Sequence, residues 1–186
     1  MPWNDETLVA GLKRRDGPAV EFAVETYAPR LYRYAVYQLG DTAAAEDLVS
    51  EVVTRMLEKI DGYTYTGAPF QAWLFQIARN LVTDSYRQKA RAQVVSLEGW
   101  LEGGEGYDVG ANDTRIESLA DQDTLLRVLA QLTDEQRQVI TLRLIEGWQP
   151  AEIAELLGRS IDSVKSLQYR AMQAMRRCVE QLQADY

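Results

Sequence analysis

Side chains that can contact DNA gather between Arg159 and Arg177, near the end of the chain. This stretch holds five basic residues against a single acid, Asp162. Hydroxyl, ammonium and guanidinium groups reach phosphates and base edges when the N-terminal half of a helix lies in the major groove. The candidates for such contacts are Arg159, Ser160, Ser163, Lys165, Ser166, Tyr169 and Arg170. The spacing predicts a DNA-reading helix, although an ordinary helical corner can have the same pattern.

Two helices and a tight turn have to position these side chains. Pro150 suits the first turn of a short helix ending near Leu157, and Gly158 suits the left-handed residue that closes it. Ser160 is a good N-cap for the last helix, which we expect to run to about residue 182. The apolar side of that helix should pack inward and holds Val164, Leu167, Ala171 and Met175. The candidate DNA contacts lie away from this side, so the pattern is that of a helix-turn-helix.

The acidity of the whole chain does not contradict DNA binding, because it is concentrated in one segment. The formal net charge is −8, of which residues 93–121 contribute −6, while residues 1–92 and 122–186 are each at −1. A second basic stretch, Arg79 to Arg91, holds four basic residues against Asp84. Screening limits repulsion between charges to about 10 Å at moderate salt. The two basic stretches therefore either bind nucleic acid or are solvated helix faces.

The residue types exclude several kinds of chemistry. The chain has one cysteine, Cys178, and no histidine, so it cannot form an internal disulfide and a zinc site is not expected. It has no glycine-rich phosphate loop and no nucleophile paired with a base, so we expect neither a cofactor nor an enzyme. The N-terminus lacks a signal pattern, and no apolar run approaches the length of a membrane span. We therefore expect a cytoplasmic protein that does not insert into membranes.

Helical periodicity runs through most of the remaining chain. Apolar residues recur every three or four positions in segments 19–39, 43–60 and 70–91, and no segment alternates as a strand would. Segment 43–60 is apolar on one side, and its other side consists of Glu46, Asp47, Ser50, Glu51, Thr54, Arg55 and Glu58. Thr133 and Gln136 form a capping box that opens a further helix.

These patterns predict an all-α protein of two small helical domains. Residues 98–113 contain five glycines and five acids without apolar periodicity, which is typical of a flexible linker. We therefore place an N-terminal helical domain at 1–92, a flexible acidic linker at 93–114, and a C-terminal domain with the helix-turn-helix at 115–186.

Two motifs in this order resemble one family. The run "LTDEQRQVITLRLIEGWQPAEIAELLGRSIDSVKSLQYRAM" resembles the C-terminal domain of bacterial sigma factors, particularly the extracytoplasmic-function (ECF) group of the sigma-70 family. "AEDLVSEVVTRM", followed by "FQAWLFQIARNLVTDSYR", is similar to the N-terminal domain of the same group. The resemblance implies that the C-terminal domain binds the minus-thirty-five promoter element. It also implies that the N-terminal domain binds the polymerase clamp and the minus-ten element.

The resemblance assigns a partner to the helix at 43–60. In the family, the matching helix docks on a helical coiled coil of the RNA polymerase clamp. Its polar side suits such a partner, whereas the same pattern on an isolated helix would indicate an ordinary solvated face. The implied polymerase-binding residues are Glu46, Asp47, Glu51 and Arg55.

The resemblance also assigns the minus-ten element to the loop at 61–69 and the helix after it. Strand opening requires flat side chains that stack on an unpaired base, and amide or charged groups that hold it. The implied residues are Tyr63 and Tyr65 in the loop, with Asn80, Asp84 and Arg87 on the helix. Trp73 lies on the apolar stripe of that helix, so we expect it in the core.

The expected function is therefore that of a sigma factor. Such a protein binds core RNA polymerase and promoter DNA, and supports melting and initiation without catalysis of its own. Family members are commonly held by an anti-sigma factor, which is a further possible partner. The alternative is a helix-turn-helix regulator of the response-regulator output type, which binds duplex DNA without melting it. That class predicts an α/β domain upstream, where this sequence is helical.

Overall fold

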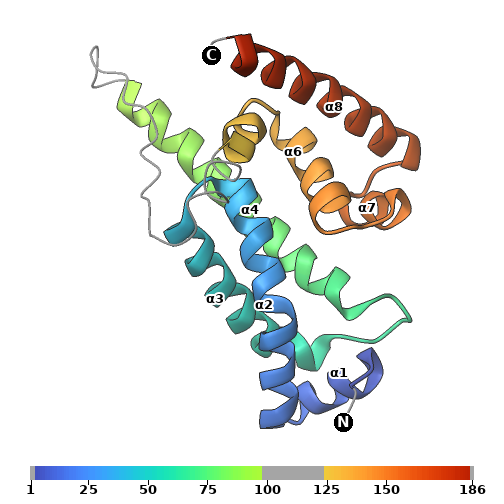
Figure 1. Ribbon diagram of the computed structural model, residues 1–186. Coiled ribbons are helices and arrows are strands. Elements are labelled where there is room, and N and C mark those ends of the chain that lie inside the picture. Colours follow the sequence, from blue (N-terminus) through green and yellow to red (C-terminus); the bar gives the residue numbers. More distant parts are fainter. Residues whose placement is uncertain (1–2, 98–123, 185–186) are drawn as a thin grey trace.

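The computed structural model describes residues 3–97 and 124–184, and within these ranges every regular element is helical (Figure 1). The all-α fold class is therefore confirmed for the described residues. The N-terminal half, residues 3–97, contains α1 (Asp5–Lys13), α2 (Gly17–Leu39), α3 (Thr42–Lys59), the 3-10 turn η1 (Ile60–Gly62) and α4 (Phe70–Leu97). The C-terminal half, residues 124–184, contains a helical stretch at 124–130, α6 (Asp134–Ile140), the π-helical turn η2 (Thr141–Ile145), α7 (Pro150–Leu157) and α8 (Ile161–Ala184).

The helix ends follow from local sequence. Gly40 closes α2 in a left-handed conformation at φ 69°, and the Asp41 carboxylate then accepts from the Ala44 N–H to begin α3. Thr133 and Gln136 form the predicted capping box of α6. Gly158 closes α7 at φ 62°, where a side chain would strain the backbone.

The structure describes only the first five residues of the expected linker at 93–114. α4 continues to Leu97, so residues 93–97, which we assigned to the linker, are helical instead. The remainder of the expected linker, 98–114, lies outside the described residues. The division into domains at 92 and 115 remains a prediction.

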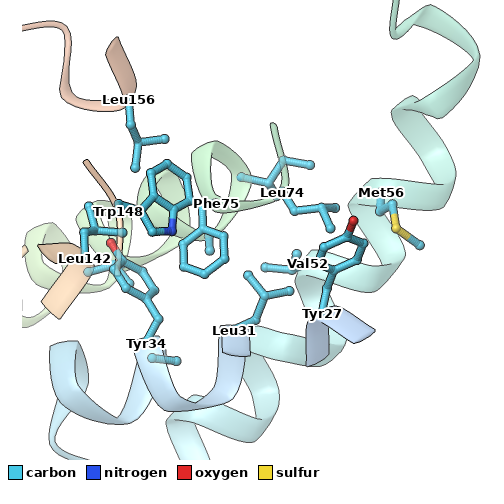
Figure 2. Packing of buried hydrophobic residues seen from close by; sticks show 14 of the residues in the cluster. Tyr27, Leu31, Tyr34, Val52, Met56, Leu74, Phe75, Leu142, Trp148 and Leu156 are labelled. Carbon is cyan, nitrogen blue, oxygen red and sulfur yellow. The ribbon is translucent and has the colours of Figure 1, made fainter. Parts of the chain in front are cut away.

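The core begins where α2, α3 and α4 pack against one another. Tyr34 of α2 meets the edge of Phe75 from α4, with ring centroids 5.4 Å apart. The C-terminal half joins the same core: Trp148 packs on Phe75 at 5.1 Å, and Leu142 and Leu156 lie beside it (Figure 2). One continuous apolar cluster therefore extends across both halves, which the sequence did not predict.

The position of Trp73 differs from the expected one. Phe70 and Phe75 are fully buried, but Trp73 is only half-buried and packs against the surface of the core. Helix geometry explains the difference, because Trp73 lies at the margin of the apolar stripe that Phe70, Leu74 and Ile77 form. Its remaining surface faces the groove described below.

Candidate nucleic-acid and polymerase interfaces

The helix-turn-helix is formed by α7 and α8, and its buried side is the predicted one. Val164, Leu167 and Ala171 are almost fully buried against α6 and α7. The Ser160 hydroxyl accepts from the Ser163 N–H at 3.2 Å, so Ser160 caps α8 as expected. Ser163 is half-buried. The other predicted contact residues are exposed: Arg159, Ser160, Lys165, Ser166, Tyr169 and Arg170.

These exposed side chains are not equally available to a ligand. The Arg159 guanidinium pairs with the Glu135 carboxylate at the start of α6. The Tyr169 hydroxyl accepts from the Gln173 amide at 2.9 Å, although its side chain remains 66% exposed. Among the described residues, Lys165 forms no ion pair. An ammonium group without a partner is the better candidate for a phosphate contact.

The polar side of α3 is exposed as predicted. The opposite side of the helix is buried through Ala45, Leu48 and Val52. The acids Glu46, Asp47 and Glu51 are therefore exposed to solvent. Arg55 is half-buried and donates to the Glu51 carboxylate at 2.7 Å. Since this pair neutralises itself, the net charge of the predicted interface comes from Glu46 and Asp47.

A shallow groove between α2 and α3 adjoins this acidic face. Its volume is about 510 Å³, and the sequence did not predict it. The floor is apolar and the rim carries two carboxylates; the lining consists of Val24, Glu25, Ala28, Pro29, Tyr32, Glu46, Val49 and Ser50. Acidic groups beside apolar surface suit a partner helix with basic and apolar side chains.

The two loop tyrosines differ in their surroundings. Tyr63 is half-buried and packs on Phe70 at 5.7 Å and Trp73 at 4.7 Å between ring centroids. Burial raises the pKa of the Tyr63 phenol above its usual value. Tyr65 is 38% exposed. Tyr63 thus supports the core as well as offering part of a ring, whereas Tyr65 is the freer stacking surface.

The polar residues predicted on α4 lie in one row. Trp73, Asn80, Asp84 and Arg87 are separated by seven, four and three positions, which places them on one face of a helix. Asn80, Asp84 and Arg87 are exposed, and Arg87 pairs with Asp84 at 3.5 Å. Tyr63 stacks on Trp73, so the row continues from α4 into the loop. The sequence missed Trp73 as a member of this row, although its spacing from Asn80 is a usable signal.

At its Trp73 end, this row borders a groove that lies between the N-terminal half and α7 of the C-terminal half. The groove has a volume of about 300 Å³. Tyr63, Trp73 and Gln76 line one wall, and Glu152, Glu155 and Leu156 of α7 line the other. The sequence did not place α7 here, because no local pattern reports contact between distant helices.

The described residues show no site for a metal. No group of three or more potential ligands among His, Cys, Asp and Glu comes together within 3–97 and 124–184. None of the helices in the described part of the chain is long and apolar enough to cross a membrane.

Two stretches of the chain match known families. Residues 23–92 match the Sigma-70 region 2 family and residues 122–175 match the Sigma-70, region 4 family. The first stretch contains α3 with most of α2 and α4. The second contains α6, α7 and the first part of α8.

Similar curated proteins carry one description, "ECF RNA polymerase sigma factor". BldN of Streptomyces coelicolor is 37% identical over 153 residues, which cover 82% of this chain and 57% of BldN. This chain therefore spans little more than half of that relative. SigL of Mycobacterium tuberculosis is 30% identical, with 94% of this chain and 96% of SigL covered. SigX of Bacillus subtilis is 32% identical, with 87% and 84% covered.

Solved structures share the fold. CnrH in complex with the cytosolic domain of CnrY superposes with a TM-score of 0.72 at 22% identity, covering 95% of this chain and 97% of that one. The sigma factor RpoE of Bartonella quintana, solved with the anti-sigma factor NepR, gives 0.68 at 24% identity, covering 86% and 96%.

Proposed function

This chain belongs to the ECF group of the sigma-70 family, and we propose that it binds core RNA polymerase and directs promoter recognition, DNA melting and transcription initiation. One observation carries the proposal: region 2 and region 4 match in the family's order, and each coincides with a helical unit that exposes most of the expected side chains. The protein then works as a binding subunit in the cytoplasm, and the chemistry belongs to the polymerase.

We assign polymerase binding, duplex recognition and binding of the opened strand to three separate surfaces. We assign polymerase binding to the acidic face of α3 with Glu46, Asp47, Glu51 and Arg55. Duplex recognition at the upstream element falls to α8, where Lys165 and Arg170 are the leading candidates. The row of Asn80, Asp84 and Arg87, continued by the two loop tyrosines, holds the opened strand. The support is the exposure of these side chains, except for the half-buried Arg55 and Tyr63, together with a ring surface for stacking and polar groups for a base edge.

An anti-sigma factor is a proposed further partner. CnrH and RpoE, which share the fold, were both solved with a protein partner, and that of RpoE is an anti-sigma factor. The apolar groove between α2 and α3 is a surface on which a partner helix can lie.

The alternative, a response-regulator output domain that binds duplex DNA, is less well supported. It requires an α/β domain upstream, and among residues 3–97 the structure contains helices and no strand. The regulator and the sigma factor still differ in one measurable property, since only the sigma factor opens base pairs.

Run-off transcription and permanganate footprinting with core polymerase test the proposal. Wild-type protein should direct initiation from specific fragments and make thymines near the start site reactive. Replacing Tyr63 and Tyr65 together with alanine should lower that reactivity while protection of the upstream element persists, because base–aromatic stacking contributes about 1–3 kcal/mol per base.

The structure supplies a control for this experiment. Tyr63→Ala also removes packing from Phe70 and Trp73, so Tyr63→Phe, which keeps the ring, and Tyr65→Ala alone should be compared. If wild-type protein opens no thymines at any promoter that it binds, the sigma-factor proposal fails. If the double mutant opens them as well as wild type, only the assignment of the tyrosines fails.

A further inference from the structure

The first helix of the chain and the turn after it contact both ends of the loop that carries Tyr63 and Tyr65. α1 packs beside η1, close to the loop at 63–69 (Figure 1). The residues that match region 2 begin at 23, so α1 lies outside them. The family match thus assigns no role to α1, although its contacts lead directly to the loop.

Asp5 holds the end of the loop at which α4 begins. Its carboxylate accepts from the Phe70 N–H at 2.9 Å, and Phe70 is the first residue of α4. The first N–H groups of a helix have no partner within that helix, so Asp5 acts as an N-cap supplied by a distant segment. Burial, and after it the negative charge of Asp5, raises the pKa of the Tyr63 phenol. The carboxylate therefore lies near the Tyr63 ring as well.

Arg15 holds the other end, where η1 leads into the loop. Its guanidinium donates to the Asp61 carboxylate at 2.8 Å and to the Leu12 carbonyl at 3.2 Å. In the described part of the chain, Arg15 is the one non-glycine residue with a positive φ, at 57°. A side chain strains the backbone in this conformation. Arg15 thus keeps an unfavourable conformation at the position from which its guanidinium reaches Asp61.

The Arg15 contact contributes more to position than to stability. The Arg15 and Asp61 side chains are 46% and 63% exposed, and an exposed ion pair contributes little to the free energy of unfolding. Glycine would relieve the strain at Arg15, so stability alone does not favour an arginine there. Residues 63–69 form neither helix nor strand, so the placing of this loop depends on its two ends and on the packing of Tyr63.

We propose that Asp5 and Arg15 are positioning residues for promoter melting, which hold the two ends of the loop at 63–69 so that Tyr63 and Tyr65 meet the opened strand. The proposal rests on the proposed function as a sigma factor. It adds α1, which precedes the matched region, to the parts of the chain on which strand opening depends. Neither residue has to touch DNA in this role.

Amide hydrogen exchange of the full-length chain, followed by NMR, tests whether Asp5 holds the start of α4. Asp5→Ala should raise the exchange rate of the Phe70 N–H several-fold, because the acceptor is lost. Asp5→Asn keeps an oxygen that can accept the same bond, so it should retain most of the protection. Glu6→Ala removes an exposed acid of the same turn and should leave the rate unchanged. Unchanged Phe70 exchange in Asp5→Ala would overturn the role of Asp5.

Arg15→Gly separates position from stability. It removes the guanidinium and the backbone strain together, so the thermal stability should equal or exceed that of wild type. Permanganate-reactive thymines should nevertheless appear several-fold more slowly with core polymerase. Arg15→Lys keeps a cation that can pair with Asp61 and should restore most of the rate. Arg14→Ala, which removes the neighbouring positive charge, should open DNA at the wild-type rate.

The same assay should show slower opening for Asp5→Ala and rescue by Asp5→Asn, while protection of the upstream element and polymerase binding stay at wild-type levels. Wild-type opening rates in both Asp5→Ala and Arg15→Gly would overturn the proposal. A rate that falls only in variants with lowered thermal stability would also overturn it, because the two residues would then only support the fold. If wild-type protein itself opens no promoter, the proposed function fails, and the Phe70 exchange rates still report whether Asp5 holds the loop.

Discussion

The basic residues of α8 and of the turn before it differ in whether they already have a partner. Arg159 pairs with Glu135, whereas Lys165 is exposed and forms no ion pair among the described residues, and the Arg170 guanidinium donates only a 3.4 Å bond to the Ser166 carbonyl. An unpaired cation can give its full charge to a phosphate, while a paired one must first lose its partner. Lys165 and Arg170 are therefore the residues on which DNA affinity should depend most.

We predict that Lys165→Ala and Arg170→Ala each weaken binding to the upstream promoter element. The loss of one phosphate contact should lower the salt slope by about one unit, and the loss of a base contact should cost about 1–3 kcal/mol. Fluorescence anisotropy over a range of salt concentrations measures both quantities. Lys13→Ala, on the distant helix α1, is the control for a general loss of positive charge. Unchanged affinity and slope in both α8 variants would remove this helix from the DNA.

Tyr86 is a residue at which tertiary structure changes acid–base behaviour. Its hydroxyl donates to the Gln38 carbonyl at 2.6 Å and accepts from Arg137. Burial raises the pKa of the Tyr86 phenol to about 12, even though Arg137 acts in the opposite direction. The neutral phenol is thus favoured in the folded protein.

This shift predicts a loss of stability at alkaline pH. The stability from the neutral Tyr86 phenol is fully present below the unfolded-state pKa near 10, and is lost as pH rises toward about 12. Urea unfolding at pH 9 and pH 11 should show a smaller decrease in unfolding free energy for Tyr86→Phe than for wild type. At pH 9 the same variant should be about 1 kcal/mol less stable, because two hydrogen bonds are lost. Tyr65→Phe controls for removing a surface hydroxyl, and equal pH dependence in wild type and Tyr86→Phe would contradict the assignment.

At the scale of the element, α3 has separate structural and binding sides. Ala45, Leu48, Val52 and Met56 bury one side, so substitutions on the other side leave the packing intact. Asp47 is exposed and forms no ion pair within the described residues. A charge reversal there changes the surface potential without changing the fold.

We predict that Asp47→Arg abolishes co-purification with core RNA polymerase, because the reversed charge places like against like at the interface. The circular dichroism spectrum and the melting temperature should stay close to those of wild type. Glu21→Arg, an equivalent reversal at an exposed position of α2, should bind polymerase normally. Wild-type affinity in a well-folded Asp47→Arg protein would show that polymerase docks elsewhere.

At the scale of the whole molecule, the halves share a core although they match separate family regions. Trp148 of the C-terminal half is 3% exposed and packs on Phe75, which is fully buried in the N-terminal half. Apolar contact of this kind couples the unfolding of the parts that it joins. The Glu146 carboxylate pairs with Arg30 and Arg33 of α2 across the same boundary.

We predict that wild-type protein unfolds in one calorimetric transition, and that Trp148→Ala separates it into two. Truncating a buried tryptophan costs about 3–5 kcal/mol, and here much of that loss falls on the contact between the halves. Met172→Ala, which truncates a side chain that is 45% exposed on α8, should keep a single transition. A single transition in Trp148→Ala would mean that the coupling does not pass through this residue.

Local features of the sequence were sufficient to predict most of the helices. Gly40, Gly158 and the Thr133–Gln136 capping box mark helix ends through bonds within a few residues, so they depend little on the rest of the molecule. Apolar periodicity correctly predicted the buried sides of α3 and α8 for the same reason. The family resemblance, which comparisons with known proteins confirmed, also rests on residues that are near one another in sequence.

The tertiary structure decided everything that depends on contacts between distant segments. Glu146 and Trp148 follow no helical period, so their burial against Arg30 and Phe75 could not be predicted from the residues around them. The half-burial of Trp73 and the covering of its groove by α7 have the same cause, since both depend on how two separately encoded halves dock. Local hydrogen bonds and apolar periodicity determine the helices and their polar faces. Docking between the halves determines which of those faces remain exposed to solvent.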